Sequence, residues 1–123
     1  MTVALLARDL MIASRIAAAA ERAGVRFARV DDPAGLPSPT EVGLLLVDWG
    51  ERGADWGERI AAWCAGAPES VRPRVLLFGP HVDTEAHAAA RAARLGPMMA
   101  RSKLVADLPS LIGSFGQSLS MAP

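Results

Sequence analysis

Cysteine, lysine and histidine are scarce in this chain, and tyrosine is missing. A single cysteine, Cys64, excludes an internal disulfide and a zinc site built from several cysteines. No apolar run approaches the roughly 20 residues that a membrane-spanning helix needs, and the first residues lack the basic stretch of a signal peptide. We therefore expect a cytoplasmic protein that does not contact a membrane. Abundant arginine and alanine, with Lys103 as the single lysine, are typical of GC-rich bacteria.

An excess of charge of one sign is also lacking. The 13 basic and 13 acidic residues cancel, so the chain as a whole has no field that would attract nucleic acid or an anionic membrane. Such a balance favours self-association more than a strongly charged surface would. The 123 residues, about half of them hydrophobic, most simply form one domain with its own core. We assign residues 1–116 to this domain and residues 117–123 to a flexible C-terminal tail.

Five short hydrophobic runs predict β-strands. The third is the clearest, because four apolar residues are followed directly by Asp48, as in a strand buried on both faces of a parallel sheet. The second alternates between apolar and polar residues, which indicates a half-exposed edge strand. The predicted strands are residues 3–7, 25–30, 42–48, 74–79 and 98–100.

Four segments have the spacing of amphipathic helices. Gly24 can end the first of them, and Trp56, Ile60 and Trp63 share one face of the second. The predicted helices are residues 10–23, residues 55–65, a segment that Asp83 or Thr84 caps and that runs to residue 95, and residues 104–115 with Pro109 near the start. Residues 31–40 contain three prolines and are predicted to be a loop without a regular helix. The alternation of strands and helices predicts an α/β fold, with parallel strands and helices on both faces.

The order of these elements resembles the CheY-like receiver domain of bacterial response regulators over nearly the whole chain. Residues 43–49, Gly-Leu-Leu-Leu-Val-Asp-Trp, carry the strongest local match, and residues 5–24 and 75–111 match in length and pattern. The resemblance implies a flavodoxin-like, doubly wound sheet of five strands in the order 2-1-3-4-5, with the second helix shortened or absent. It also implies that Asp48 occupies the position of the phospho-accepting aspartate.

The rest of a receiver's phosphorylation site is altered. Receivers hold Mg²⁺ with two acids after the first strand, and here Ala7 and Arg8 stand at those positions, with Asp9 shifted into the start of the helix. Gly79 replaces the hydroxyl residue after the fourth strand, and Arg101 replaces the lysine after the fifth. The resemblance therefore implies Mg²⁺ only if the site is active.

These departures predict a vestigial site in which an arginine takes the place of the metal ion. Arg8 could occupy the cation's position and pair with Asp48, and a solvated acid at the edge of the sheet is the alternative. Asp9, Arg101 and Lys103 are the other candidates for ion pairs at this edge of the sheet.

A metal site at the same edge is a weaker alternative, because His81, Asp83 and His87 follow the fourth strand and could approach Asp48. The two histidines are six residues apart, whereas a helix brings residues three or four apart together. We expect instead that Asp83 caps the helix and that the histidines are partly solvated. Cys64 is expected to be an inert core thiol.

Two features predict a protein interface. Trp49 follows Asp48 in a loop and is a candidate contact for a partner, although packing in the core or in the loop is the favoured interpretation. The missing second helix should uncover apolar surface on the face that residues 55–65 and 83–95 also cover. A homodimer or a protein partner would cover that surface.

We therefore expect a stand-alone degenerate receiver that is no enzyme, needs no cofactor and signals by protein contact without phosphorylation. The alternative is a working receiver that is phosphorylated on Asp48. A third possibility is a small metal-binding protein or enzyme that uses Asp48, His81 and Asp83.

Overall fold

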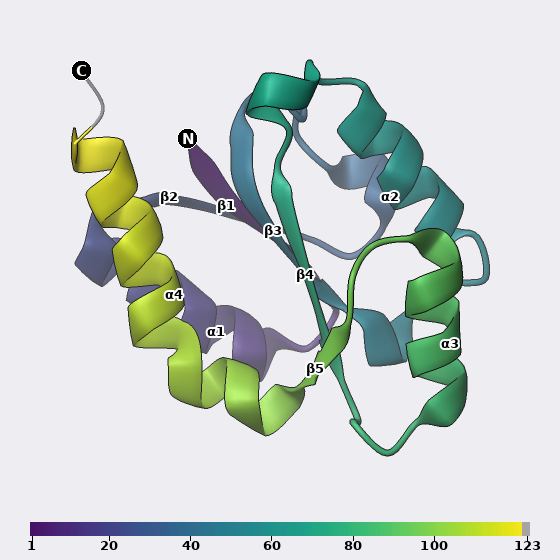
Figure 1. Ribbon diagram of the computed structural model, residues 1–123. Helices are drawn as coiled ribbons and strands as arrows, with labels where there is room; N and C mark the ends of the chain where they lie inside the picture. The colour runs from purple at the N-terminus through teal and green to yellow at the C-terminus, as the bar shows by residue number, and fades with distance from the viewer. Residues whose placement is uncertain (122–123) are drawn as a thin grey trace.

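The five predicted strands form one parallel sheet in the order β2-β1-β3-β4-β5 (Figure 1). The computed structural model describes residues 1–121, and the side chains of residues 1–114. The strands are β1 (Thr2–Leu6), β2 (Arg26–Val30), β3 (Val42–Asp48), β4 (Arg74–Gly79) and β5 (Met98–Ala100). The predicted α/β class and the 2-1-3-4-5 order of a flavodoxin-like fold are confirmed.

Four α-helices cover the sheet, two on each face (Figure 1). α1 and α4 lie together on one face, and α2 and α3 lie on the other. Three short 3₁₀-helices complete the described fold. The helices are α1 (Leu10–Ala23), α2 (Trp56–Ala65), α3 (Thr84–Ala93), α4 (Arg101–Met121), η1 (Pro33–Gly35), η2 (Trp49–Glu51) and η3 (Glu69–Val71).

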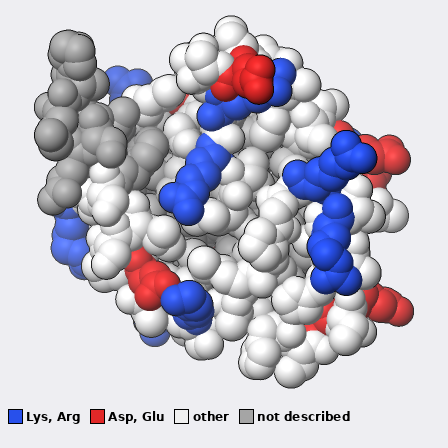
Figure 2. All heavy atoms as spheres, viewed as in Figure 1, with Lys and Arg blue, Asp and Glu red and all other residues white. Residues whose placement is uncertain are grey.

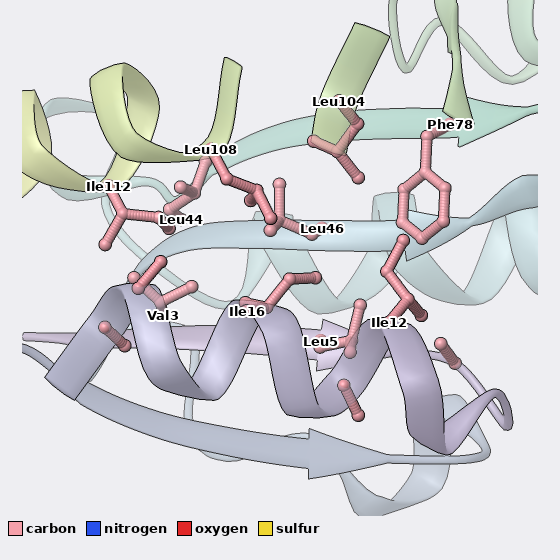
Figure 3. Close-up of a cluster of buried hydrophobic side chains, with 14 of the residues drawn as sticks. Val3, Leu5, Ile12, Ile16, Leu44, Leu46, Phe78, Leu104, Leu108 and Ile112 are labelled. Atoms are coloured by element: carbon pink, nitrogen blue, oxygen red, sulfur yellow. The ribbon is translucent and has the colours of Figure 1, made fainter. Parts of the chain in front are cut away.

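The alternation of side chains along the central strands divides the core into two layers. Val3 and Leu5 of β1 face α1 and α4, together with Ile12 and Ile16 of α1 and Leu108 of α4 (Figure 3). The intervening residues of β1 face α2 and α3. Since both faces of β1 and β3 are covered, these strands need the nearly continuous apolar runs that the sequence shows.

α1 begins and ends as its sequence predicts. The carboxylate of Asp9 caps its first turn by accepting hydrogen bonds from the backbone amides of Met11 and Ile12, at 2.8 and 3.4 Å. Gly24 ends the helix in the left-handed conformation, with φ of 69°, which a residue without a Cβ adopts without strain.

The missing second helix does not uncover the sheet, although an open hollow of about 710 Å³ remains between α2 and α3 on the same face. Ala4, Leu6 and Val42 on that face are completely buried. The loop after β2 forms η1 and packs its apolar side chains there, and Trp63 of α2 packs beside it. The homodimer stays a prediction.

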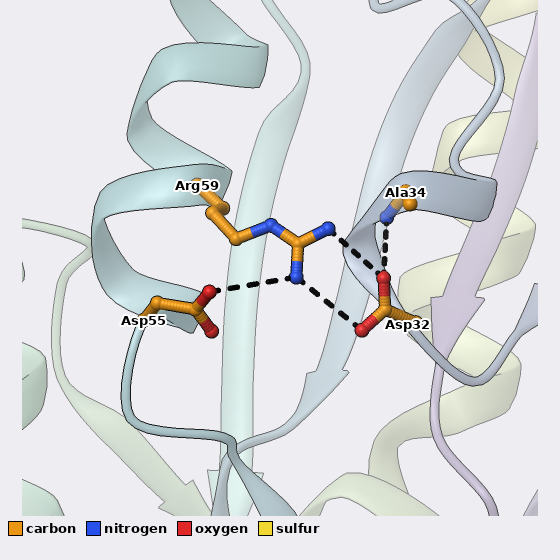
Figure 4. A network of polar contacts seen from close by, with 4 residues as sticks. All are labelled: Asp32, Ala34, Asp55 and Arg59. Carbon is orange, nitrogen blue, oxygen red and sulfur yellow. Dashed lines mark hydrogen bonds and ion pairs between the residues drawn. The ribbon is translucent and has the colours of Figure 1, made fainter.

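Polar contacts hold this loop against α2. The guanidinium of Arg59 donates to both carboxylate oxygens of Asp32, at 2.9 and 3.3 Å, and lies 3.7 Å from Asp55 (Figure 4). The indole Nε1 of Trp63 donates to the carbonyl of Pro37 at 2.8 Å. The loop with η1 thus packs beside α2 and α3 on this face, where the missing second helix was expected to leave a gap.

α4 differs most from its predicted bounds. It begins at Arg101, directly after β5, and continues through Met121, whereas residues 104–115 were predicted. Pro109, Gly113 and Gly116 lie inside it, although an interior proline removes one backbone hydrogen bond and each interior glycine costs about 0.5–1 kcal/mol. Of the predicted tail, residues 117–121 continue the helix, and residues 122 and 123 lie outside the described residues.

Charged side chains do not form a continuous surface of one sign on the face seen in Figure 2, where small groups of both signs are separated by uncharged areas. Among the described helices, none combines the length and the hydrophobicity needed to cross a membrane.

Candidate functional site

Asp48 is the one charged residue that is buried within the described part of the chain. It ends β3, the central strand of the sheet, and is paired in register with Phe78 of β4. Its side chain is only 3% exposed. The predicted place of Asp48 at the carboxyl edge of a parallel sheet is therefore correct, but the carboxylate lies beneath the surface of that edge.

The turn that follows Asp48 closes the edge above β4. A Cβ atom added to Gly79 would lie 3.1 Å from the backbone nitrogen of Gly50 and 2.9 Å from the sulfur of Met98. One added to Gly50 would lie 2.8 Å from Pro80. The two glycines allow the backbone of η2 to pack directly on the end of β4, which leaves no room for a side chain at position 79.

Trp49 anchors this turn: the favoured prediction that it packs inside the molecule is confirmed, and its candidacy as an interface residue is contradicted. Its side chain is 1% exposed, and its indole Nε1 donates to the carbonyl of Ala86 in α3 at 2.9 Å. The guanidinium of Arg52 lies over the ring, 5.4 Å from its centroid. Trp49 is buried because η2 folds back toward α3 immediately after Asp48, instead of projecting from the edge.

Arg101 is the cation beside Asp48. Its Nη1 lies 3.7 Å from Oδ2 of Asp48, and its Nη2 pairs with the carboxylate of Asp9. The guanidinium of Arg101 thus joins the buried carboxylate of Asp48 in β3 to the partly exposed carboxylate of Asp9, which caps α1. The predictions of Asp9 and Arg101 as ion-pair residues at this edge are confirmed.

Arg8 and Lys103 do not take part, contrary to prediction. Arg8 is exposed, and its charge acts on Asp32, at the end of β2, because the chain leaves β1 on that side of the sheet. Lys103 pairs with Asp107, one helical turn further along α4, at 2.9 Å. It turns away from Asp48 because α4 begins at Arg101 without an intervening loop.

The charge of Asp48 is incompletely compensated. Burial raises the pKa of its carboxyl group, Arg101 opposes this shift, and the nearby charges of Glu51 and Asp9 reinforce it. Its Oδ2 has no hydrogen-bond partner among the described residues. By contrast, the backbone amide of Met11 lowers the pKa of Asp9. Arg101 therefore lies between one carboxylate that ionises easily and one that resists ionisation.

The candidate metal ligands do not converge. Asp83 caps α3 by accepting a hydrogen bond from the amide of Ala86 at 3.0 Å, and Nε2 of His87 lies 2.7 Å from the backbone carbonyl of His81. Within the described residues, no group of three histidine, cysteine or acidic side chains could hold a metal ion. Asp48, His81 and Asp83 are thus not brought together. Cys64 is partly buried, and burial raises the pKa of its thiol.

An open groove of about 600 Å³ lies outside Arg101, between α1 and α4. Met11 and Arg15 line it from α1, and Val105 lines it from α4. The sequence interpretation missed this surface. A sequence pattern that could have indicated the groove was present. Met11 and Arg15 are four residues apart, so they share one side of the helix, and this side lies next to the face that Ile12 and Ile16 bury.

Comparison of the chain with protein families, with curated proteins and with solved structures found no match. The structure defines an α/β protein with a five-stranded parallel sheet, a flavodoxin-like strand order and a buried acid–arginine pair at the carboxyl edge. Membership of the receiver family stays a prediction.

Proposed function

We propose that this protein is a receiver-like binding module that acts by contact with another protein, without phosphorylation of Asp48. The observation that carries the proposal is the burial of Asp48 beside Arg101. A nucleophilic carboxylate must meet its phosphodonor in line, with its charge balanced by a metal ion. Asp48 is 3% exposed and already faces a guanidinium.

The surroundings of Asp48 support the same conclusion. A receiver needs acids that are free to hold Mg²⁺, whereas Asp9 both caps α1 and pairs with Arg101. A receiver also uses a hydroxyl group after the fourth strand, and the space beside Gly79 is filled by Gly50 and Met98. Arg101 supplies a permanent positive charge beside Asp48.

The proposal includes a cytoplasmic location, where a reduced thiol such as that of Cys64 persists. It includes neither an enzymatic activity nor a nucleic-acid partner, since the charges of the chain balance.

Phosphorylation can be tested directly. The protein is incubated with acetyl phosphate and Mg²⁺, and in parallel with beryllofluoride, and its intact mass is measured. We expect no adduct on the native chain or on Asp48→Ala. A phosphoryl adduct that appears on the native chain and disappears in Asp48→Ala would establish a working receiver and overturn the proposal.

The metal alternative is tested by titration of Zn²⁺ and Mn²⁺ into the native protein and into His81→Ala. We expect no saturable binding to either. Binding that is lost in His81→Ala would favour a metal-binding protein.

A further inference from the structure

α1 and α4 pack side by side through a buried row of apolar side chains (Figures 1 and 3). Two hollows lie between them, of about 600 and about 230 Å³. Both are lined by Arg15 and Val105, so they form one groove along α1. The groove extends from Met11 to Arg22, which is about 16 Å at the rise of an α-helix.

One end of the groove is apolar and exposed. Leu10 and Met11, in the first turn of α1, are 67% and 75% exposed, and they are adjacent in sequence. The other large apolar side chains that are exposed in the described structure, Met1, Val71 and Val82, stand alone. Met11 lines the groove itself, and its unbranched side chain can adapt to a partner's surface.

The groove is also positively charged. Arg15, Arg22 and Arg101 line it, and Asp9, the one carboxylate among its lining residues, is paired with Arg101. Among the described residues, Arg15 and Arg22 form no salt bridge. The groove therefore presents two unpaired guanidinium groups beside an exposed apolar pair, in a protein whose total charge is zero.

We propose that this groove docks an acidic amphipathic α-helix of a partner protein. Apolar side chains of that helix rest on Met11 and Val105, and its carboxylates pair with Arg15 and Arg22. An amphipathic helix laid in a groove uses anchors three, four and seven residues apart, and about eleven residues of helix span the 16 Å available. The inference gives the proposed binding module its surface, and in that respect it rests on the proposed function.

A second copy of the chain does not fit this surface. Two copies that met through α1 would bring Arg15 and Arg22 of one protomer toward those of the other, and like charges at an interface repel. A partner with carboxylates along the edges of an apolar stripe removes this repulsion and matches both features of the groove.

The probe is a fluorescein-labelled helical peptide of about 14 residues, with leucines three, four and seven residues apart and glutamates at the flanking positions. A second peptide has the same leucines with lysines in place of the glutamates. Fluorescence anisotropy measures binding at low and at high salt. We expect the acidic peptide to bind, more weakly as salt increases, and the basic peptide not to bind.

Charge reversal locates the interaction. The double variant Arg15→Glu/Arg22→Glu should weaken binding of the acidic peptide at least about tenfold, because each pair is lost and replaced by repulsion. The matched control is Arg91→Glu/Arg94→Glu, in the last turn and at the C-cap of α3, which makes the same change of charge on the opposite face. This control should bind like the native protein. Circular dichroism verifies that both variants fold.

A methyl NMR experiment gives an independent result. The peptide should shift the methyl signal of Met11 in the groove and leave that of Met98, which is buried, unchanged.

The proposal is overturned if the acidic peptide does not bind, or if the control pair weakens binding equally. It is also overturned if anionic vesicles bind while the peptide does not, or if light scattering shows a dimer that Arg15→Glu/Arg22→Glu dissociates. The two proposals are tested independently. Absence of peptide binding would not contradict the proposal that Asp48 is not phosphorylated, and a phosphoryl adduct on Asp48 would not contradict binding of the peptide to the groove.

Discussion

The Nη1 atom of Arg101 lies 3.7 Å from Oδ2 of Asp48, so the first residue of α4 is paired with the last residue of β3. The separation is too long for a hydrogen bond, and Oδ2 has no other partner among the described residues. The pair is thus an ion pair that compensates the buried charge only in part. Since Arg101 also pairs with Asp9, one side chain joins α1, β3 and α4.

Removal of the guanidinium should destabilise the fold through Asp48. Breaking a fully buried pair costs about 3–5 kcal/mol, but the side chain of Arg101 is 42% exposed and solvent weakens its interaction. We therefore expect Arg101→Gln to reduce the free energy of unfolding by about 1–2 kcal/mol. Urea denaturation monitored by tryptophan fluorescence measures the change.

The effect of Arg101→Gln should depend on the carboxylate. In an Asp48→Asn background, the same substitution should cost less, and the difference is the coupling energy between the two side chains. Lys103→Gln is the control on the same helix, because its exposed pair with Asp107 should contribute under about 1 kcal/mol. Equal effects of Arg101→Gln with and without Asp48 would contradict the assigned pair.

Because its pKa is raised, Asp48 contributes to the free energy of unfolding in a way that depends on pH, and the sign of this dependence can be stated. In the interval between the pKa of an unfolded aspartate, about 4, and the raised folded value, the folded state binds a proton that the unfolded state does not. Stability should therefore increase as the pH falls through this interval, by at most about 1.4 kcal/mol per pH unit. Above the interval, the ionised carboxylate destabilises the fold. The charged groups that act on it are Arg101, Glu51 and Asp9.

Comparison with Asp48→Asn isolates this contribution. Asp9 and Asp32 have lowered pKa values, so their stabilisation is lost as the pH falls through those lower values, the opposite sign. Both carboxylates remain in the variant. The stability of the native protein minus that of Asp48→Asn should increase as the pH falls toward about 4, the pKa of an unfolded aspartate. Parallel pH profiles would show that Asp48 does not titrate in this range.

The sheet was predictable because its strands are buried on both faces. Such strands need uninterrupted apolar runs, and residues 44–47 are one. The strand order followed from the resemblance, since runs of this kind do not specify their neighbours. The cover of the second face was not predictable: the apolar contacts of Leu36 and Trp63 join residues that are distant in sequence, and spacing along one helix does not reveal them.

The position of Asp48 was predictable for the same reason as its strand, but its partner was not. Arg8 and Arg101 both follow strands that end at the same edge. Which guanidinium reaches Asp48 depends on where α4 begins, and no capping residue before Arg101 signals that helix start. The burial of Trp49 likewise depends on the fold of η2 against α3, which a loop sequence does not specify.

Restoring the hydroxyl residue of a receiver at position 79 should damage the fold instead of rebuilding a phosphorylation site. The Cβ of Gly79→Thr would lie 3.1 Å from the backbone of Gly50, which cannot move without displacing η2. We expect a loss of about 1–3 kcal/mol in thermal or urea denaturation. Gly113→Ala is the control, since nothing lies within 4 Å of its added Cβ and it is inside α4. This control should gain about 0.5–1 kcal/mol, and a stable, phosphorylatable Gly79→Thr would contradict the closed edge.

The contact between Arg59 and Asp32 should keep residues 31–40 ordered against α2. Arg59→Ala removes both hydrogen bonds to Asp32 and the contact with Asp55, and the carboxylate of Asp32 loses the partner that lowers its pKa. Backbone amides of residues 31–40 should then exchange with deuterium faster, while those of β3 should be unchanged, because local opening of a surface loop does not require unfolding of the sheet. Mass spectrometry of peptides from both segments measures the exchange, with Arg91→Ala as an arginine control outside the contact.

High salt should also speed the exchange of residues 31–40 in the native protein, since exposed ion pairs are screened. Unchanged exchange in Arg59→Ala would show that the apolar contacts of Leu36 and Trp63 hold the loop alone.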